Sequence, residues 1–202
     1  MKDDIAHVNY LMQSRRSVFP KDYIQGERVA DEIIEKMLEN ANWAPTHKLT
    51  EPWRFVVFTK EGLHQLAEIQ ASCYKKVTTA DGSFKEERYQ NLLKKPLQSS
   101  HIILIIMKRD EKEKVREVEE IGAVFCAIQN MYLTAASYGV GCYLSTGGVT
   151  YFEEAKKSFG LQKEDRIIGF FNVGVIREDF EVKSKRHSVK EKTKWINRLE
   201  NE

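Results

Sequence analysis

Ile102-Ile103-Leu104-Ile105-Ile106-Met107 is the longest strongly apolar run in the chain. A short continuous run of this kind is typical of a strand that is buried on both faces. It is far too short to cross a bilayer as a helix, so we expect no membrane partner. The run therefore predicts a central strand in a sheet that is layered with helices.

A long helical pattern follows this strand, over residues 112–138. Its apolar positions recur at helical spacing and, past Ile121, cover nearly the whole circumference. A helix that is apolar all round belongs in the centre of a fold or in a subunit interface. The segment thus predicts a second central element.

The remaining segments mix helical and strand patterns without strict alternation. Apolar spacing predicts helices over residues 5–14, 28–43, 62–76, 84–94 and 151–159. Ser188, with Glu191 three residues later, resembles a capping box that starts a last helix through Leu199. Aromatic and β-branched runs predict strands over residues 53–59, 140–145 and 166–177. This order predicts an α+β fold in a single domain that spans residues 1–202.

Composition excludes several functional classes. The chain is 42% hydrophobic and 31% charged, as in a soluble globule, and its formal charge of +2 does not indicate a nucleic-acid partner. The cysteines, Cys73, Cys126 and Cys142, form no CxxC pair, and the N-terminus lacks the pattern of a signal peptide. The histidines are scattered without metal-ligand spacing. We therefore expect a cytoplasmic protein without a metal site.

Two guanidinium groups and a hydroxyl stand together in Arg15-Arg16-Ser17, at the end of the first predicted helix. The planar fork of an arginine matches a phosphate, and a serine adds a short donor. The alternative is a solvated pair near a helix C-terminus, where cations are favoured in any case.

A second polar cluster lies in the loop between Trp43 and Trp53, which Pro45 and Pro52 restrict. This loop carries three consecutive hydrogen-bond donors, Thr46, His47 and Lys48. Polar loops on a rigid scaffold are common binding sites. The alternative is a structural loop whose two tryptophans belong to the core.

Two further features complete the set of candidates. Leu144-Ser145-Thr146-Gly147-Gly148 follows a predicted strand, and its glycines permit a ligand to approach the backbone closely. The run 183–187 is basic. An ordinary strand-to-helix turn and a solvated charge run are the alternatives for these two segments.

Taken in this order, the four features resemble the nitroreductase family. Members have a helix ending in Arg-Arg-Ser, and later a helix that runs into Ala-Pro, a short polar stretch and Pro-Trp-x-Phe. Here these last motifs are Ala44-Pro45 and Pro52-Trp53-Arg54-Phe55, while Ile168-Gly169-Phe170 and Val173-Gly174 match a later strand. The resemblance spans residues 10–195, and the Ala-Pro-x-His-Lys loop is similar to that of a branch with small subunits.

The resemblance implies a three-layer α/β/α sandwich with a mixed, mainly antiparallel sheet, in an intertwined homodimer that binds FMN in a cleft at its interface. The positions that would hold FMN are, in chain order, Arg15, Arg16, Ser17, His47, Lys48, Leu144, Ser145, Thr146, Gly147 and Arg186. Arg15 and Ser17 would hold the phosphate and ribityl end, with Arg16 beside them, and Arg186 would be a second phosphate clamp. The pair from the Ala-Pro loop would lie near the flavin, and the four consecutive residues would lie against the buried side of the isoalloxazine.

The chain also departs from the family pattern. Glu51 is acidic where many members have an amide. A basic residue often precedes the strand that matches residues 102–107, and either Lys94 or Lys95 could serve.

By resemblance, the expected activity is a ping-pong transfer of electrons from NADH or NADPH, through FMN, to a small acceptor such as a nitroaromatic or a quinone. The hydride chemistry belongs to the flavin, so we nominate no catalytic acid or base. One rival is a flavin-binding or sensing protein on the same scaffold. Another rival is a nucleic-acid-associated protein that binds through the basic run 183–187. The near-neutral net charge of the whole chain disfavours this rival.

Overall fold

The computed structural model describes residues 2–112, 114–181 and 184–198. Its four strands are β1 (Trp53–Thr59), β2 (His101–Met107), β3 (Val140–Ser145) and β4 (Arg166–Val175), in the spatial order β1-β2-β4-β3. A mainly antiparallel sheet is confirmed, but its expected parallel part is wrong, because every neighbouring pair of these described strands is antiparallel. β2 and β3 run in the same direction, and β4 separates them.

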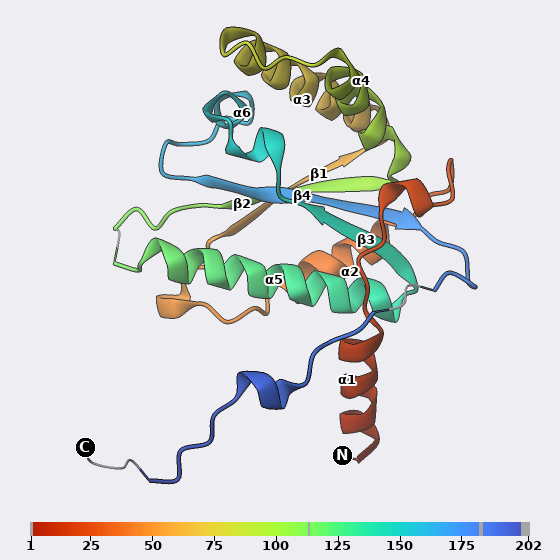
Figure 1. Ribbon diagram of the computed structural model, residues 1–202, viewed down its shortest axis with the longest axis vertical. Coiled ribbons are helices and arrows are strands. Elements are labelled where there is room, and N and C mark those ends of the chain that lie inside the picture. The colour runs from red at the N-terminus through yellow and green to blue at the C-terminus, as the bar shows by residue number, and fades with distance from the viewer. Residues whose placement is uncertain (1, 113, 182–183, 199–202) are drawn as a thin grey trace.

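Helices cover both faces of this sheet and confirm the three-layer arrangement (Figure 1). α2 (Asp31–Ala41) and α5 (Glu117–Ser137) pack on one face. α3 (Glu61–Ala80) and α6 (Glu153–Ser158) pack on the other, where α4 (Glu86–Lys94) lies against α3. Short 3₁₀ turns connect these elements: η1 (Pro20–Asp22), η2 (His47–Leu49), η3 (Lys95–Gln98), η4 (Gly148–Tyr151) and η5 (Val189–Lys192).

β2 is buried along its whole length, as its continuous apolar run predicts. Successive side chains of a strand point to opposite faces. Ile103, Ile105 and Met107 accordingly join the core beneath α2 and α5. Ile102, Leu104 and Ile106 join the core beneath α3 and α6. Each core is thus built on one side of the same strand.

Most predicted elements are confirmed, and β1 and β3 have the predicted bounds. The long helix α5 starts at Glu117, later than expected, because the preceding loop is fixed by the buried carboxylate of Glu120. That carboxylate pairs with Arg109 and accepts a bond from the backbone N–H of Asp110. Of the two tryptophans, Trp53 is buried whereas Trp43 is 85% exposed.

The predicted last helix is wrong in the described residues. Ser188 caps only the short turn η5, where its Oγ accepts a bond from the N–H of Lys190 at 3.2 Å. Its apolar residues Val189, Trp195 and Ile196 are exposed. A short helix is marginal in water unless an apolar face packs against something, and here that packing is absent from the described residues. Leu199, the expected end, lies outside the described residues.

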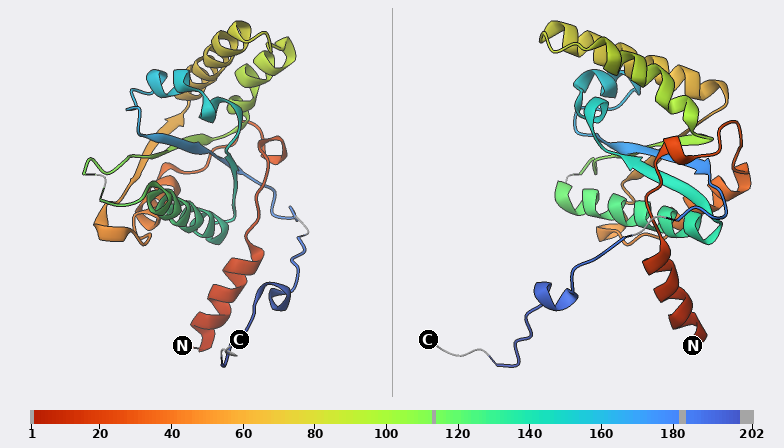
Figure 2. Two further views of the ribbon diagram at one scale, coloured as in Figure 1. Left: turned by 60° about the vertical axis from the view of Figure 1, so that its left-hand side comes forward. Right: turned by 45° about the vertical axis from the view of Figure 1, so that its right-hand side comes forward.

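Both ends of the chain leave the layered body. α1 (Lys2–Ser14) projects from it, and the segment after β4 also runs away from the sheet (Figure 2). Among the described residues, no helix combines the length and the apolar character needed to span a membrane.

The chain between α1 and α2 is held on the sheet by the buried ring of Tyr23. This ring lies against Gly141 and Gly174, which are paired across β3 and β4. The hydroxyl of Tyr23 donates a hydrogen bond to the carbonyl of Asn172 at 3.2 Å. The two glycines leave the space that the ring occupies, so this contact positions η1 at the edge of the sheet.

A methyl group at this place should therefore destabilise the fold. In Gly174→Ala the new Cβ would lie 2.8 Å from Cε2 of Tyr23 and closer still to two other ring atoms. We expect the free energy of unfolding to fall by about 1–3 kcal/mol, measured by chemical denaturation. The control is Gly62→Ala, whose Cβ would meet only Phe58 at 3.9 Å. Equal stability of the two variants would contradict the packing role of Tyr23.

A buried histidine should make the stability depend on pH. His101 hydrogen-bonds through Nε2 to Asp31 at 2.9 Å and through Nδ1 to Ser100 at 2.8 Å. Burial lowers the pKa of His101 below its ordinary value of 6.5, although the bond to Asp31 opposes this shift. The unfolded chain therefore binds more protons near pH 6, and stability should fall as the pH is lowered through 6.5.

The test compares His101→Asn with the native chain between about pH 7 and pH 5. The substitution should flatten the slope of the unfolding free energy by up to about 1.4 kcal/mol per pH unit. His64→Asn, on the exposed side of α3, should keep the native slope. A native slope in His101→Asn would show that another group carries the pH dependence.

Candidate functional site

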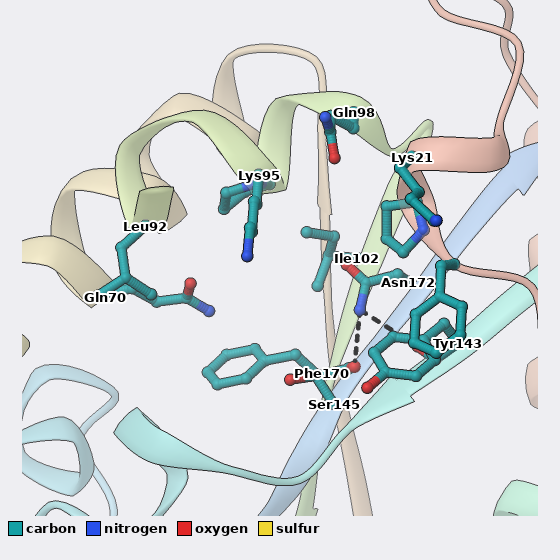
Figure 3. A pocket seen from close by; sticks show the side chains of 13 residues that line it. Lys21, Gln70, Leu92, Lys95, Gln98, Ile102, Tyr143, Ser145, Phe170 and Asn172 are labelled. Carbon is teal, nitrogen blue, oxygen red and sulfur yellow. Dashed lines mark hydrogen bonds between the residues drawn. The ribbon is translucent and has the colours of Figure 1, made fainter. Parts of the chain in front are cut away.

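A cavity of about 390 Å³ lies on the α3/α4 side of the sheet, above β3 and β4 (Figure 3). Its floor comes from alternate residues of these strands, Tyr143 and Ser145 on β3 and Phe170 and Asn172 on β4. The intervening side chains point to the opposite core, because side chains alternate along a strand. The cavity therefore lies between one face of the two strands and the helices that cover this face.

The floor is largely aromatic, and its asparagine is hydrogen-bonded within the protein. The ring of Tyr143 packs against Phe19, with centroids 4.6 Å apart. The side-chain amide of Asn172 donates to the carbonyls of Tyr143 and Phe170, and its oxygen accepts from the hydroxyl of Ser99. The polar atoms of Asn172 are thus already hydrogen-bonded within the protein. The aromatic faces are therefore the main surface that a ligand can contact.

The walls of this cavity carry positive charge. Lys21 comes from η1 and Lys95 from η3, and the Lys95 ammonium and the Gln70 amide point into the cavity (Figure 3). None of the described residues that line it is acidic. Of the two lysines that the sequence left as alternatives, Lys95 lines the cavity and Lys94 does not. The site therefore favours a flat molecule with negative character.

A second cavity of about 590 Å³ continues the first along α4 to the loop after β3. The two cavities share Gln70, Leu92, Lys95, Tyr143, Ser145 and Phe170, so they form one cleft. Ser145, Thr146 and Gly147, three of the predicted site residues, line its second part. The side chain of Leu144 instead packs against the core beneath α5.

Arg15 and Ser17 meet the free edge of β3 through Tyr132 of α5. The Arg15 guanidinium lies over the Tyr132 ring, 5.1 Å from its centroid, and the Ser17 and Tyr132 hydroxyls are 3.5 Å apart. The same Tyr132 oxygen accepts a bond from the backbone N–H of Leu144 at 2.8 Å. Burial raises the pKa of Tyr132, so it remains a neutral phenol. Residues from three separate parts of the chain, before η1, in α5 and in β3, are thus brought together.

The chain from Arg15 to Phe19 connects this cluster to the cleft. Within it, Val18 is buried and donates its N–H to the carbonyl of Cys142 at 2.8 Å, which covers part of the free edge of β3. Arg16 lines a smaller cavity of about 200 Å³ beside Arg15 and bonds to nearby carbonyls. This segment therefore carries Arg15 and Ser17 of the cationic cluster at one end and Phe19, which packs against the floor of the cleft, at the other.

His47 and Lys48 lie elsewhere, at the N-terminal end of α5. His47 donates through Nδ1 to Glu119 at 2.7 Å, a bond that lowers the pKa of the Glu119 carboxyl. Lys48 donates to the carbonyl of Lys114 at 3.1 Å. Neither side chain lines the cleft.

Their loop has an unusual backbone. Lys48, Leu49 and Glu51 have φ values of 54°, 52° and 43°, in the left-handed region that residues other than glycine rarely adopt. Leu49 is also 81% exposed. Strained backbone with exposed apolar side chains is typical of segments that meet a ligand or a partner.

Arg186 is exposed on the C-terminal segment and bonds only locally, to Ser184 and to the carbonyl of Lys185. The segment leaves the sheet, so one chain does not bring Arg186 to the cleft (Figure 1). Lys183, the first residue of the basic run, lies outside the described residues.

Sequence reasoning missed several residues of the cleft. Tyr132 has the helical spacing of a core residue, and only its contact with Ser17, 115 positions away, reveals its place. Tyr143 and Phe170 could have been found from the alternation along their strands, because each shares a face with a polar site residue. Phe19 had no signal beyond its closeness to Ser17.

Comparisons with known proteins identify the family that this chain resembles. The family model described as the nitroreductase family matches residues 12–175. The chain is 32% identical over 176 residues to the Bacillus subtilis (strain 168) protein named "Putative NAD(P)H nitroreductase YfhC", with 87% of each chain covered.

Solved structures share the fold. A nitroreductase-like family protein from Bacillus cereus has a TM-score of 0.78 at 26% identity, covering 94% of this chain and 96% of that one. The FMN-dependent nitroreductase NfnB from Mycobacterium smegmatis, solved in complex with NADPH, has a TM-score of 0.70 at 15% identity, covering 94% and 98%.

Proposed function

Because the chain belongs to the nitroreductase family, we propose that it binds FMN in the cleft and reduces small electrophilic acceptors with NADH or NADPH. The names of the B. subtilis and M. smegmatis relatives support this proposal, since they specify NAD(P)H in one case and FMN with NADPH in the other. Nitroaromatics and quinones are the acceptor classes that we propose.

The observation that carries the proposal is the continuity between two chemically different surfaces. FMN combines a flat ring system with a polyol and a phosphate. The aromatic floor around Phe19 and Tyr143 suits the ring, while Arg15 and Ser17 offer a guanidinium and a hydroxyl for the phosphate and ribityl end. The segment 15–19 supplies Arg15 and Ser17 to one surface and Phe19 to the other, so the residues present fit the cofactor.

When bound, FMN would supply hydride transfer, which none of the twenty side chains provides. The protein would orient the reactants and place charge. Lys21 and Lys95 would favour negative charge on a ring in the cleft, because opposite charges attract strongly where water is partly excluded. Ser145, Thr146 and Gly147 would lie beside the ring.

One cleft would serve donor and acceptor in turn, which is the geometry of a ping-pong cycle. The donor would leave as NAD⁺ or NADP⁺ after giving up a hydride. A quinone acceptor would then gain this hydride and one proton from solvent, and leave as a hydroquinone. The cycle therefore requires no acid or base from the protein.

We further propose a homodimer. α1 projects from the body of the chain, and its apolar side chains Ile5, Val8 and Met12 are between 51% and 62% exposed. Leu49 and Trp195, on two other segments, are also exposed. Exposed apolar side chains of this kind indicate surfaces that become buried on association.

Association would also complete the site. His47, Lys48 and Arg186 do not reach the cleft of their own chain, so we infer that they act in the cleft of a second copy. The strained loop around Lys48 supports this inference, because strain of about 1–3 kcal/mol per residue persists where surrounding structure compensates for it.

The cofactor assignment is tested by the visible absorption of the purified protein. The native protein should be yellow, and NADH or NADPH should bleach it without oxygen. Arg15→Ala should bind FMN about 10- to 100-fold more weakly, because a charge-assisted hydrogen bond is lost. Fluorescence titration of the apoprotein with FMN measures this change.

Arg54→Ala is the matched control, since Arg54 lies on β1, the opposite edge strand, and bonds only to nearby carbonyls. Unchanged FMN affinity in Arg15→Ala would overturn the phosphate assignment. A colourless protein that cannot be reconstituted would overturn the function itself. A yellow protein that neither nicotinamide bleaches would favour the flavin-binding or sensing alternative.

The homodimer is tested by sedimentation equilibrium. The native chain should have twice the chain mass of 23.5 kDa. Val8→Glu combined with Met12→Glu should shift the equilibrium toward single chains, because two charges would have to be buried. His7→Glu, which is exposed on the same helix but is neither three nor four residues from Ile5, Val8 or Met12, should remain dimeric if the apolar face forms the interface. A single-chain native protein would contradict the proposal.

A further inference from the structure

Arg88 of α4 stands across the second part of the cleft from the loop that follows β3. A Cβ built on Gly148 would lie 2.8 Å from its guanidinium nitrogen Nη2, and Gly148 has φ of +64°. Lys85, Lys95 and Arg88 line this part of the cleft, with Glu87 as the one acidic residue among the described lining residues. The α4 wall therefore has an excess of positive charge.

The Arg88 guanidinium is positioned by an aromatic ring rather than by an acid. It lies over Tyr74 of α3, 5.4 Å from the ring centroid. Within the described part of the chain, no carboxylate forms an ion pair with Arg88 or with Lys85. Lys76, two residues after Tyr74 on α3, forms an ion pair with Glu154 at 2.7 Å, so this nearby carboxylate is paired with a different cation.

Tyr74 also fixes the start of α4. Its hydroxyl accepts a hydrogen bond from the backbone N–H of Lys85 at 3.0 Å. One buried tyrosine thus holds both the beginning of the cationic wall and the side chain of Arg88. A guanidinium oriented in this way retains its donors for a ligand, since stacking uses only the faces of its plane.

We propose that Arg88, assisted by Lys85, forms a subsite for an anionic group on a molecule that enters the cleft. The chemical class is a carboxylate or a phosphate, and the favoured occupant is an aromatic acceptor that carries a carboxylate. This inference rests on the proposed function. It adds a substrate class: acceptors with a negative charge on the side of the ring that faces α4.

The test compares two acceptors of similar shape, 4-nitrobenzoate and 4-nitrobenzamide, with the FMN-loaded protein and NADH. The native protein should prefer the carboxylate by about tenfold in kcat/KM, because a charge-assisted bond adds discrimination. Arg88→Gln should lose this preference, and Arg88→Lys should keep part of it. The preference should also shrink when salt is added.

Lys75→Ala is the matched control. Lys75 lies over the ring of Tyr89, 5.5 Å from its centroid, on the same pair of helices, but it does not line the cleft. It should keep the native preference. Isothermal titration with benzoate and benzamide provides a measurement without turnover, in which Arg88→Gln should weaken only the binding of benzoate.

A second arm identifies the source of the anion. If Arg88→Gln raises the KM for NADPH but not for NADH, the subsite holds the donor's 2′-phosphate, which supports an anion subsite and replaces the favoured occupant. If neither arm responds to Arg88→Gln or to Arg88→Lys in a yellow, active protein, the subsite is refuted while the proposed function stands. Failure to bind FMN at all would refute the proposed function instead.

Discussion

Burial of β2 on both faces is the constraint on which the rest of the structure depends. A strand without a polar face must be covered twice, and here the two coverings come from different parts of the chain. α2 and α5 form one layer, and α3 and α6 form the other. The distance between the sheet and the upper layer also sets the depth of the cleft, because α3 and the α4–η3 segment lie above the sheet. The opposite face of the same sheet packs on α5.

The topology then creates a usable edge. β4 lies between β2 and β3, which leaves β3 with one unpaired edge. The segment 15–19 and the hydroxyl of Tyr132 satisfy part of this edge. The ring of Tyr23, seated on two paired glycines, keeps the segment in place. A sheet edge that would otherwise be exposed is thereby converted into the wall of a site.

The residues of the proposed site lie in different places on one chain. The cleft and the Arg15 cluster lie on the free edge of β3 and the α4 side of the sheet, whereas the loop with Lys48 bonds near the start of α5 and the segment with Arg186 runs away from the sheet. This division follows from the proposed homodimer, in which a second copy would supply the missing packing.

Local patterns in the sequence determined the buried strand, the bounds of β1 and β3, most helices, and the motifs that resemble the nitroreductase family. They could not determine the last helix, because its stability depends on packing that no local pattern encodes. Only the tertiary structure decided between Lys94 and Lys95 and brought Tyr132 to Ser17 and Leu144. The physical reason is that periodicity reports which face of an element is apolar, whereas a cleft is formed by side chains from elements far apart in the chain, whose distances are set by how the layers pack.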